Sequence, residues 1–501
     1  MKTPSNDLKD LIDFMNPSEK KEFIEKHQVK EKSPEYIILF EALANMKGYD
    51  ETQIQKELNF KHYKRVKHYL YGCLLQYLST LESQNFEKEV MDLISVGNML
   101  MDRSYFLQSK NIFHRAKKKA IEYELHSYQL IIDEKIFHVN GHLNNRVYVE
   151  GLLTPESEKV FHNKINTLIT EEKFKIAILK RWQFYERNGA ILRSKKQTSE
   201  FLNLLKPYVI NINEDELSTK SKHDYYSLKA SYFREMNKID DAVQYLEKSF
   251  ELAEKKKLEM VGMLPQILVS LNNLLFIYAK YDMLPKLRST LDRIHQHLSV
   301  KASNRKVGLV SLLVYESYYC KYVPDYSQRR KKLNWVEKEY PHILDKERTL
   351  RAIQTVFNLS VAHFCDSNFK KALSLINTLE NRENFYNFPS MVSLIKVYKL
   401  ILYFEMDKRD LLSFSIRNTY RYLLKNRIYE EFEKAVIKGL TKLINSNTQL
   451  SQKEALKAVY NDLIMIKGNE YEKSIFQTFN FSGWIKCKLE KKDFKYLMTV
   501  D

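Results

Sequence analysis

Hydrophobic residues recur every three or four positions along almost the whole chain of 501 residues. This spacing places apolar side chains on one face of an α-helix, whereas the strict alternation typical of β-strands is nowhere sustained. We therefore expect helices of about 12 to 22 residues, joined by short polar turns as in antiparallel helix pairs. The pattern predicts an all-α protein.

Residues with special backbone preferences mark several helix ends. A capping side chain followed by proline at the first helical position predicts helix starts at Asn16-Pro17, Ser33-Pro34 and Thr154-Pro155. Glycine commonly follows the last helical residue, and it predicts helix ends at Gly48, Gly189 and Gly468. The whole chain holds 11 glycines and 10 prolines, too few for the many tight turns of a β-sandwich, a propeller or a doubly wound α/β fold.

Three segments, 91–119, 223–252 and 353–379, share a pattern of small residues. In each segment a small residue in one predicted helix precedes a small residue in the next helix by twelve positions. The pairs are Gly97 with Ser109, Ala230 with Ala242, and Ser360 with Ala372. Small side chains at such positions let two antiparallel helices approach closely, while large neighbours three or four positions away fill the groove between them.

This pattern resembles the tetratricopeptide repeat, a unit of about 34 residues made of two antiparallel helices. Residues 237–250 match the turn and second helix of the family at nearly every position. The match departs from the family at Lys229, where an apolar residue is usual, and at Leu379, where a small one is usual. The resemblance implies that residues 86–501 form a right-handed α-solenoid of antiparallel helix pairs.

A solenoid of this family implies a scaffold or adaptor that binds a protein or peptide in its concave face. The family lines that face with first-helix residues one turn apart. Carried onto this chain, those positions are Asn98, Met101, Asp102, Asp224, Ser227, Ser231, Arg234 and Glu235. The lysine and arginine clamp with which some family members grip a terminal carboxylate is not reproduced at these positions.

Residues 1–85 are expected to form a separate small helical bundle that caps the solenoid. An alternative interpretation is a helix-turn-helix, because residues 50–60 predict a short helix and turn, and residues 61–81 a longer helix. The longer helix would then present basic side chains to nucleic acid. Its candidate nucleic-acid face consists of Lys61, Lys64, Arg65, Lys67 and His68, with His62 beside them.

The formal net charge of +18 suggests an anionic partner, such as nucleic acid or a membrane surface. The excess of basic residues is spread along the chain. Residues 1–100 hold 14 basic and 16 acidic residues, and the densest basic stretch, 301–350, holds 11 basic and 6 acidic residues.

The first 15 residues lack the apolar core of a signal peptide, and no apolar run is long enough to span a membrane. We expect a cytoplasmic protein, and its Lys-, Asn-, Tyr- and Phe-rich usage is typical of a bacterial one.

Motifs for catalysis are missing from the sequence. There is no phosphate-binding glycine loop, nucleophile elbow or H-E-x-x-H zinc motif. His138 and His142 have the spacing of a metal pair, but Asn140-Gly141 between them predicts a turn rather than a helix. Four cysteines, none in a C-x-x-C pair, are expected to be buried thiols of a reducing compartment. We therefore expect no enzyme, cofactor or metal site.

Overall fold

The structure is a computed structural model that describes most of the chain. It covers residues 7–15, 17–27, 34–46, 50–81, 86–144, 154–188, 194–257, 264–281, 283–298, 305–323, 325–343, 349–382, 385–446, 448–469 and 478–498, with a few single positions between them. Every regular element in this part of the chain is a helix, so the predicted all-α class is confirmed. Among these residues, no helix combines the length and apolar content needed to cross a bilayer.

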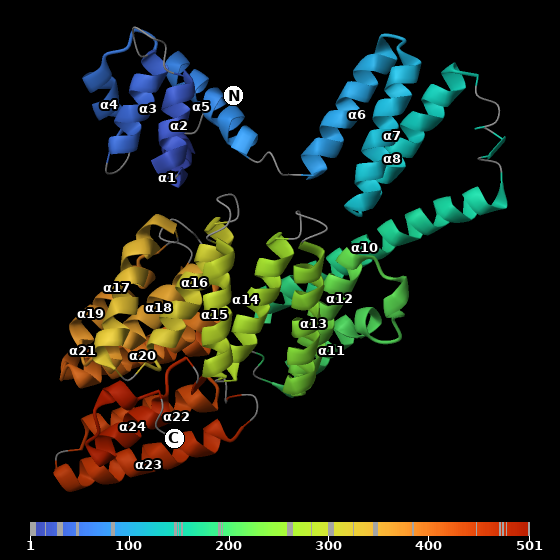
Figure 1. The fold of residues 1–501 in the computed structure, drawn as a ribbon. Coiled ribbons are helices and arrows are strands. Elements are labelled where there is room, and N and C mark those ends of the chain that lie inside the picture. The colour runs from blue at the N-terminus through green and yellow to red at the C-terminus, as the bar shows by residue number, and fades with distance from the viewer. Residues whose placement is uncertain are drawn as a thin grey trace. The chain divides into compact units, whose positions relative to one another are not determined.

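The chain divides into two compact units, Met1–Asn85 and Phe86–Asp501 (Figure 1). The first unit contains helices α1 (Asp7–Phe14), α2 (Pro17–His27), α3 (Glu35–Asn45), α4 (Glu51–Leu58) and α5 (Tyr63–Leu81). Its core forms around Phe23, whose ring lies 4.8 Å from that of Phe40 and 5.2 Å from that of Tyr77. These contacts join α2, α3 and α5, because each helix turns its apolar face inward.

The second unit is a succession of longer helices. Its first part contains α6 (Phe86–Asp102), α7 (Phe106–Glu122), α8 (His126–His142), α10 (Pro155–Asn188), α11 (Lys195–Val209), α12 (Thr219–Glu235), α13 (Ile239–Lys257), α14 (Leu264–Lys280) and α15 (Leu284–Leu298). The second part contains α16 (Arg305–Cys320), α17 (Tyr326–Ile343), α18 (Leu350–Cys365), α19 (Phe369–Glu380), α20 (Pro389–Glu405), α21 (Arg409–Lys425), α22 (Glu431–Ile444), α23 (Gln449–Lys467) and α24 (Phe481–Glu490). Single 3₁₀ turns lie at Glu214–Glu216, Phe385–Asn387 and Phe494–Tyr496 (η5).

Helices of the second unit pack in two ways. Most helices pack against the next along the chain, and Figure 1 shows α12 to α19 side by side. Alternate helices also touch, because α10 packs on α12, α12 on α14, α14 on α16 and α16 on α18. Contacts between both neighbours and next-but-one neighbours are what stacked helix pairs require. The arrangement is therefore compatible with a helical repeat.

One type of turn joins several of these helix pairs. Three residues separate the helices, and the middle one has a left-handed backbone with a positive φ. The turn after α18 is an example: Ser367 has φ 57°, its N–H donates to the Phe364 oxygen at 2.8 Å, and Asn368 N–H donates to the His363 oxygen at 2.9 Å. The same paired bonds close the turns at Ser104, Glu124, Asn237 and Asp407. This motif satisfies the last helix carbonyls before the chain reverses.

The small residues spaced by twelve positions lie where the helices meet. Ser109 on α7 donates its hydroxyl to the backbone oxygen of Gly97 on α6 at 2.8 Å. Ser360 on α18 donates to the backbone oxygen of Ala372 on α19 at 2.9 Å. Ala230 and Ala242 are both fully buried between α12 and α13. These residues allow the close approach that the sequence pattern predicted.

Helix α10 differs from the expected length. It has 34 residues, whereas helices of about 12 to 22 residues were expected. The reason is visible in its sequence, because neither glycine nor proline follows Pro155 before the helix ends at Asn188. The predicted starts at Pro17 and Pro155 and the end at Gly468 are confirmed, while α3 begins at Glu35 with Pro34 as its cap. Gly48 and Gly189 lie outside the described residues.

Candidate ligand-binding surface on helices α10, α12 and α14

The candidate partner-binding residues of α12 are brought together but are partly covered by α10. One guanidinium nitrogen of Arg181 on α10 donates to the backbone oxygen of Ser227 at 3.2 Å. The same nitrogen donates to the hydroxyls of Ser227 and Ser231 at 3.1 and 2.9 Å. Ser227 and Ser231 are accordingly buried. Asp224 stays half-buried, with its carboxylate 3.5 Å from a ring nitrogen of His223. A partner would therefore meet Arg181 in place of the two serines.

The candidate residues of α6 occupy a different place in the unit. Met101 packs against the core formed by α6, α7 and α8, and Asp102 is exposed at the end of the helix. Asn98 is half-buried, and its side-chain oxygen has no hydrogen-bond partner among the described residues. The helices that pack on α6 are α7 and α8, so these residues form a set separate from that of α12.

A cluster of charged and aromatic side chains lies at the end of α12. Arg234 donates from Nε to a carboxylate oxygen of Glu235 at 2.7 Å and from a terminal nitrogen to the Tyr185 hydroxyl. The Tyr185 hydroxyl in turn donates to Glu235 at 3.2 Å. The Arg234 guanidinium also lies over the Phe276 ring, 5.0 Å from its centre. We call Arg181, Tyr185, Arg234, Glu235 and Lys280 the charge cluster.

Lys280 is the last residue of α14 and completes the charge cluster. Its nitrogen lies 5.6 Å from the centre of the Tyr281 ring. Within the described residues, it makes neither a hydrogen bond nor an ion pair. The positive charge of Lys280 lowers the pKa of Glu235, and the positive charge of Arg234 lowers the pKa of Lys280. The charge cluster therefore contains three cations and one carboxylate.

Burial shapes the ionisation of these groups. It lowers the pKa of Lys280 to about 8, with Glu235 acting against the shift and Arg234 adding to it. It also lowers the pKa of Arg181 to about 10. Burial alone would raise the pKa of Glu235, but Arg234 and Lys280 outweigh it and hold this pKa below its ordinary value. These shifts follow from low solvation and an excess of positive charge.

Sequence reasoning missed Arg181 and Lys280. Arg181 lies on α10, outside the segments that carry the repeat pattern, so no repeat register could place it. Lys280 could have been found, because α12 and α14 both have 17 residues and both end at the equivalent position, Glu235 in one and Lys280 in the other. Aligning these two helices puts the cation beside the carboxylate.

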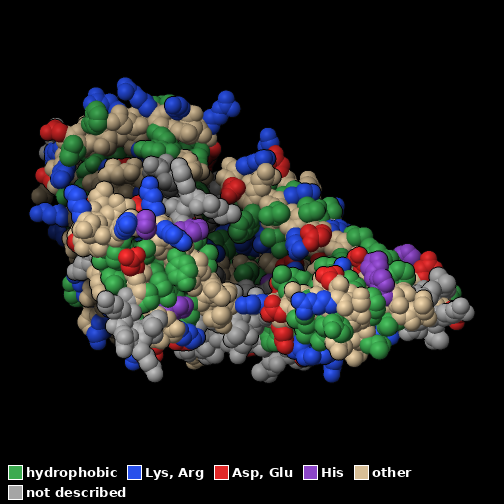
Figure 2. Space-filling view, turned by 90° about the horizontal axis from the view of Figure 1, so that it is seen from above, with side chains coloured by type: hydrophobic (Ala, Val, Ile, Leu, Met, Phe, Trp, Pro, Cys, Tyr) green, Lys and Arg blue, Asp and Glu red, His purple; other side chains and the backbone are tan. Residues whose placement is uncertain are grey.

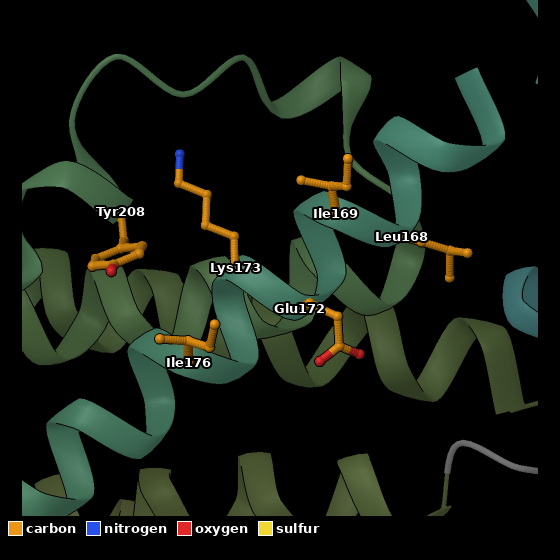
Figure 3. A pocket seen from close by; sticks show the side chains of 6 residues that line it. All are labelled: Leu168, Ile169, Glu172, Lys173, Ile176 and Tyr208. Carbon is orange, nitrogen blue, oxygen red and sulfur yellow. The ribbon is translucent and has the colours of Figure 1, made fainter. Parts of the chain in front are cut away.

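An open depression lies on another side of α10 and was not predicted. It has a volume of about 490 Å³, and Figure 3 shows its lining residues. They are Leu168, Ile169, Glu172, Lys173 and Ile176 of α10 and Tyr208 of α11. Lys173 and Glu172 point to opposite sides, and the neighbouring Leu179 and Trp182 are more than 60% exposed. The depression is apolar and lacks convergent polar groups that would fix a ligand.

The candidate nucleic-acid face on α5 is largely exposed. Lys61, Lys64, Arg65 and His68 all face solvent in the first unit, as does His62. Lys67 is the exception, because it is buried and its nitrogen lies 2.9 Å from the Glu51 carboxylate on α4. Lys67 thus holds α4 against α5. Elsewhere, Lys and Arg side chains are scattered among other residue types over the face shown in Figure 2.

The histidine pair is arranged differently from the prediction. Asn140-Gly141 does not form a turn, because α8 continues to His142. The buried side-chain amide of Asn140 donates to the backbone oxygen of Ile136, one turn earlier in α8, at 2.8 Å. The ring of His142 stacks on Phe106, and His138 lies 3.6 Å from Glu134. Among the described residues, no group of His, Cys, Asp or Glu is arranged to hold a metal ion.

Comparisons with known proteins leave the family open. No protein-family model matches the chain, and a search of curated proteins finds no match.

Proposed function

We propose that residues 86–501 form a right-handed, tetratricopeptide-like solenoid that acts as a non-catalytic scaffold. In this proposal, an extended segment of a partner protein lies across α10, α12 and α14. The stacking of alternate helices and the recurring left-handed turns support a repeat architecture. The four cysteines are free thiols, as suits a cytoplasmic protein.

The observation that carries the proposal is the charge cluster. A cluster that served stability alone would be expected to balance its charges, because a buried charge without a partner is costly. Here the three cations come from alternate helices, of which α10 packs on α12 and α12 on α14. Arg234 and Lys280 act on the Glu235 carboxylate, and Asp224 acts on Arg181, so cations outnumber carboxylates by three to two. Proteins keep such costly groups at binding sites, where a ligand completes them.

A peptide-display selection on the full chain, followed by photo-crosslinking, tests this function. Tyr281 borders the charge cluster and is replaced by the photoreactive residue benzoylphenylalanine. Gln244, exposed on α13, receives the same residue as the matched control. Selected peptides should crosslink from position 281 and not from position 244. A selection that enriches no peptide, or peptides that crosslink from position 244 alone, would overturn the proposal.

A second candidate function is nucleic-acid binding by the first unit. The observation that favours it is the exposure of Lys61, Lys64 and Arg65 at the start of α5, since exposed cations at a helix start can reach phosphates. If this function is correct, changing Lys64 and Arg65 to alanine should abolish retention on heparin or DNA, while Lys56→Ala on α4 should not. Unchanged retention of the double variant would exclude it.

A further inference from the structure

Helix α10 has apolar residues on two opposite sides. Phe174 and Ala177 are buried in the core that α10 shares with α11 and α12. On the other side, apolar residues recur at intervals of three, four or seven positions, which places them along one line of the helix. We call this line the α10 stripe; it consists of Phe161, Leu168, Ile169, Ile176, Leu179 and Trp182. A helix that is apolar on both sides is expected to be covered on both sides.

The middle of the α10 stripe is hollowed. The depression of about 490 Å³ runs along Leu168, Ile169 and Ile176, and Tyr208 of α11 lies at its other side (Figure 3). Its apolar lining suits the side chains of a second helix, which pack into such hollows without needing polar groups. A flat bilayer suits it poorly, because the surface is concave and includes the Glu172 carboxylate.

Two lysines border the depression on the side of Tyr208. The Lys180 nitrogen donates to the Tyr208 hydroxyl at 3.1 Å, and the Lys173 nitrogen lies 6.0 Å from the centre of the Tyr208 ring. Neither lysine forms an ion pair with a carboxylate in the part of the chain that the structure describes. Glu172, the carboxylate of the lining, is already paired with Lys175. The charge left to attract a partner is therefore positive.

We propose that the α10 stripe binds an amphipathic helix of a partner protein, with acidic residues along one edge of that helix. Lys173 and Lys180 are seven residues apart, so they lie on the same side of α10, about 10 Å from each other along its axis. A partner helix packed along α10 has the same period, so two carboxylates seven residues apart can reach both lysines. This surface is independent of the proposed function, because Arg181 of the charge cluster turns toward α12 instead.

A display library of helical peptides tests the inference on the full chain. Each peptide has about 20 residues, which matches the length of the stripe from Phe161 to Trp182. Leucines are fixed at alternating intervals of three and four residues, and the flanking positions are randomised. Selected peptides should carry Asp or Glu at flanking positions seven residues apart. A selection that enriches no peptide, or peptides without acidic flanks, would overturn the proposal.

Leu179→Asp locates the selected peptides. This variant should weaken their binding about tenfold or more, because it places a charge within the apolar contact. Met465→Asp is the matched control, since Met465 is an exposed apolar residue of α23, and it should bind the peptides as the wild type does. Equal binding by the wild type and Leu179→Asp would overturn the assignment to α10.

A charge reversal tests the acidic character of the partner. Changing both Lys173 and Lys180 to glutamate should weaken the acidic peptides about tenfold or more, and it should favour a peptide in which lysines replace the acidic residues. The same change at Lys453 and Lys457, both exposed on α23, is the control and should leave binding unchanged. Unaltered peptide preference in the variant at positions 173 and 180 would contradict the proposal.

Two other occupants of the stripe have their own signatures. A dimer of the full chain that Leu179→Asp dissociates, measured by sedimentation, would assign the stripe to a second copy. Sedimentation with phosphatidylserine vesicles that Leu179→Asp abolishes would assign it to a membrane surface. Either result would replace the acidic helix as the occupant.

Discussion

The hydroxyl of Ser109 donates to the backbone oxygen of Gly97, twelve residues earlier, at 2.8 Å. The bond can form because glycine has no side chain to hold α7 away from α6. Ser360 and Ala372 are also twelve residues apart and make the same kind of bond with the direction reversed, since the serine lies on the first helix of that pair. One spacing in the sequence thus produces the same close approach in two distant helix pairs.

Gly97→Ala should destabilise the second unit by about 1–3 kcal/mol, because overpacking a close helix contact forces the neighbours apart. A Cβ at position 97 would lie 2.5 Å from the ring of the buried Phe113. Urea unfolding of the full chain, followed by circular dichroism, measures the effect.

Gly141→Ala is the control for this substitution. Nothing lies within 4 Å of a Cβ at position 141, so alanine should stabilise α8 by up to about 1 kcal/mol through its higher helix propensity. Combining Gly97→Ala with Phe113→Leu should recover part of the lost stability. A wild-type midpoint for Gly97→Ala would contradict the close approach of α6 and α7.

The sequence predicts contacts within a helix pair better than contacts between distant helices. Gly97 and Ser109 were identified because short-range spacing determines which residues of two successive helices face each other. Arg181 contacts Ser227 from a helix 46 residues earlier, and nothing in the local pattern indicates that α10 crosses α12. Asn140-Gly141 misled the prediction for a related reason, since the packing of α8 overrides the weak helix preference of these two residues.

Ser367→Gly should stabilise the second unit by about 0.5–1 kcal/mol. Ser367 is exposed and has φ 57°, a backbone conformation that costs an L-residue about 1 kcal/mol and glycine almost nothing. The same change at Ser374, an exposed position inside α19, should destabilise the protein by a similar amount. Thermal unfolding of the two variants compares them directly. Equal effects at positions 367 and 374 would refute the left-handed turn.

The stability of the protein should depend on pH through Lys280. Burial lowers the pKa of Lys280 to about 8 in the folded chain, against its ordinary value of 10.5 when unfolded. Between these two values the unfolded chain holds more protons on Lys280 than the folded chain does. The contribution of Lys280 to the unfolding free energy therefore rises with pH from about 8 upward, and its full penalty is present below pH 8.

Lys280→Met isolates this contribution. The variant should be more stable than the wild type at pH 7, and the difference should decrease steadily between pH 8 and pH 10. Urea midpoints of both proteins across this range measure the difference. A difference that stays constant with pH would show that Lys280 keeps an ordinary pKa in the folded chain.

Arg329 and Asp366 form a buried ion pair that connects the C-terminal segment to the rest of the second unit. Arg329 is fully buried, and it donates to the Val323 oxygen at 2.8 Å and to the Lys495 oxygen of η5 at 3.2 Å. Its remaining terminal nitrogen pairs with the Asp366 carboxylate, whose side chain is 4% exposed.

Arg329→Met should therefore cost about 3–5 kcal/mol, because it leaves the Asp366 carboxylate buried without a cation. Adding Asp366→Asn removes that stranded charge, so the double variant should be more stable than Arg329→Met alone. Arg409→Met is the matched control. Its ion pair with Asp407 is exposed, and an exposed pair contributes less than about 1 kcal/mol. Unfolding midpoints of the wild type and of these variants measure the differences in stability. Hydrogen exchange at Phe494–Tyr496 should also increase in Arg329→Met. Equal midpoints for the single and double variants would show that the buried charge of Asp366 is not the cause of the loss.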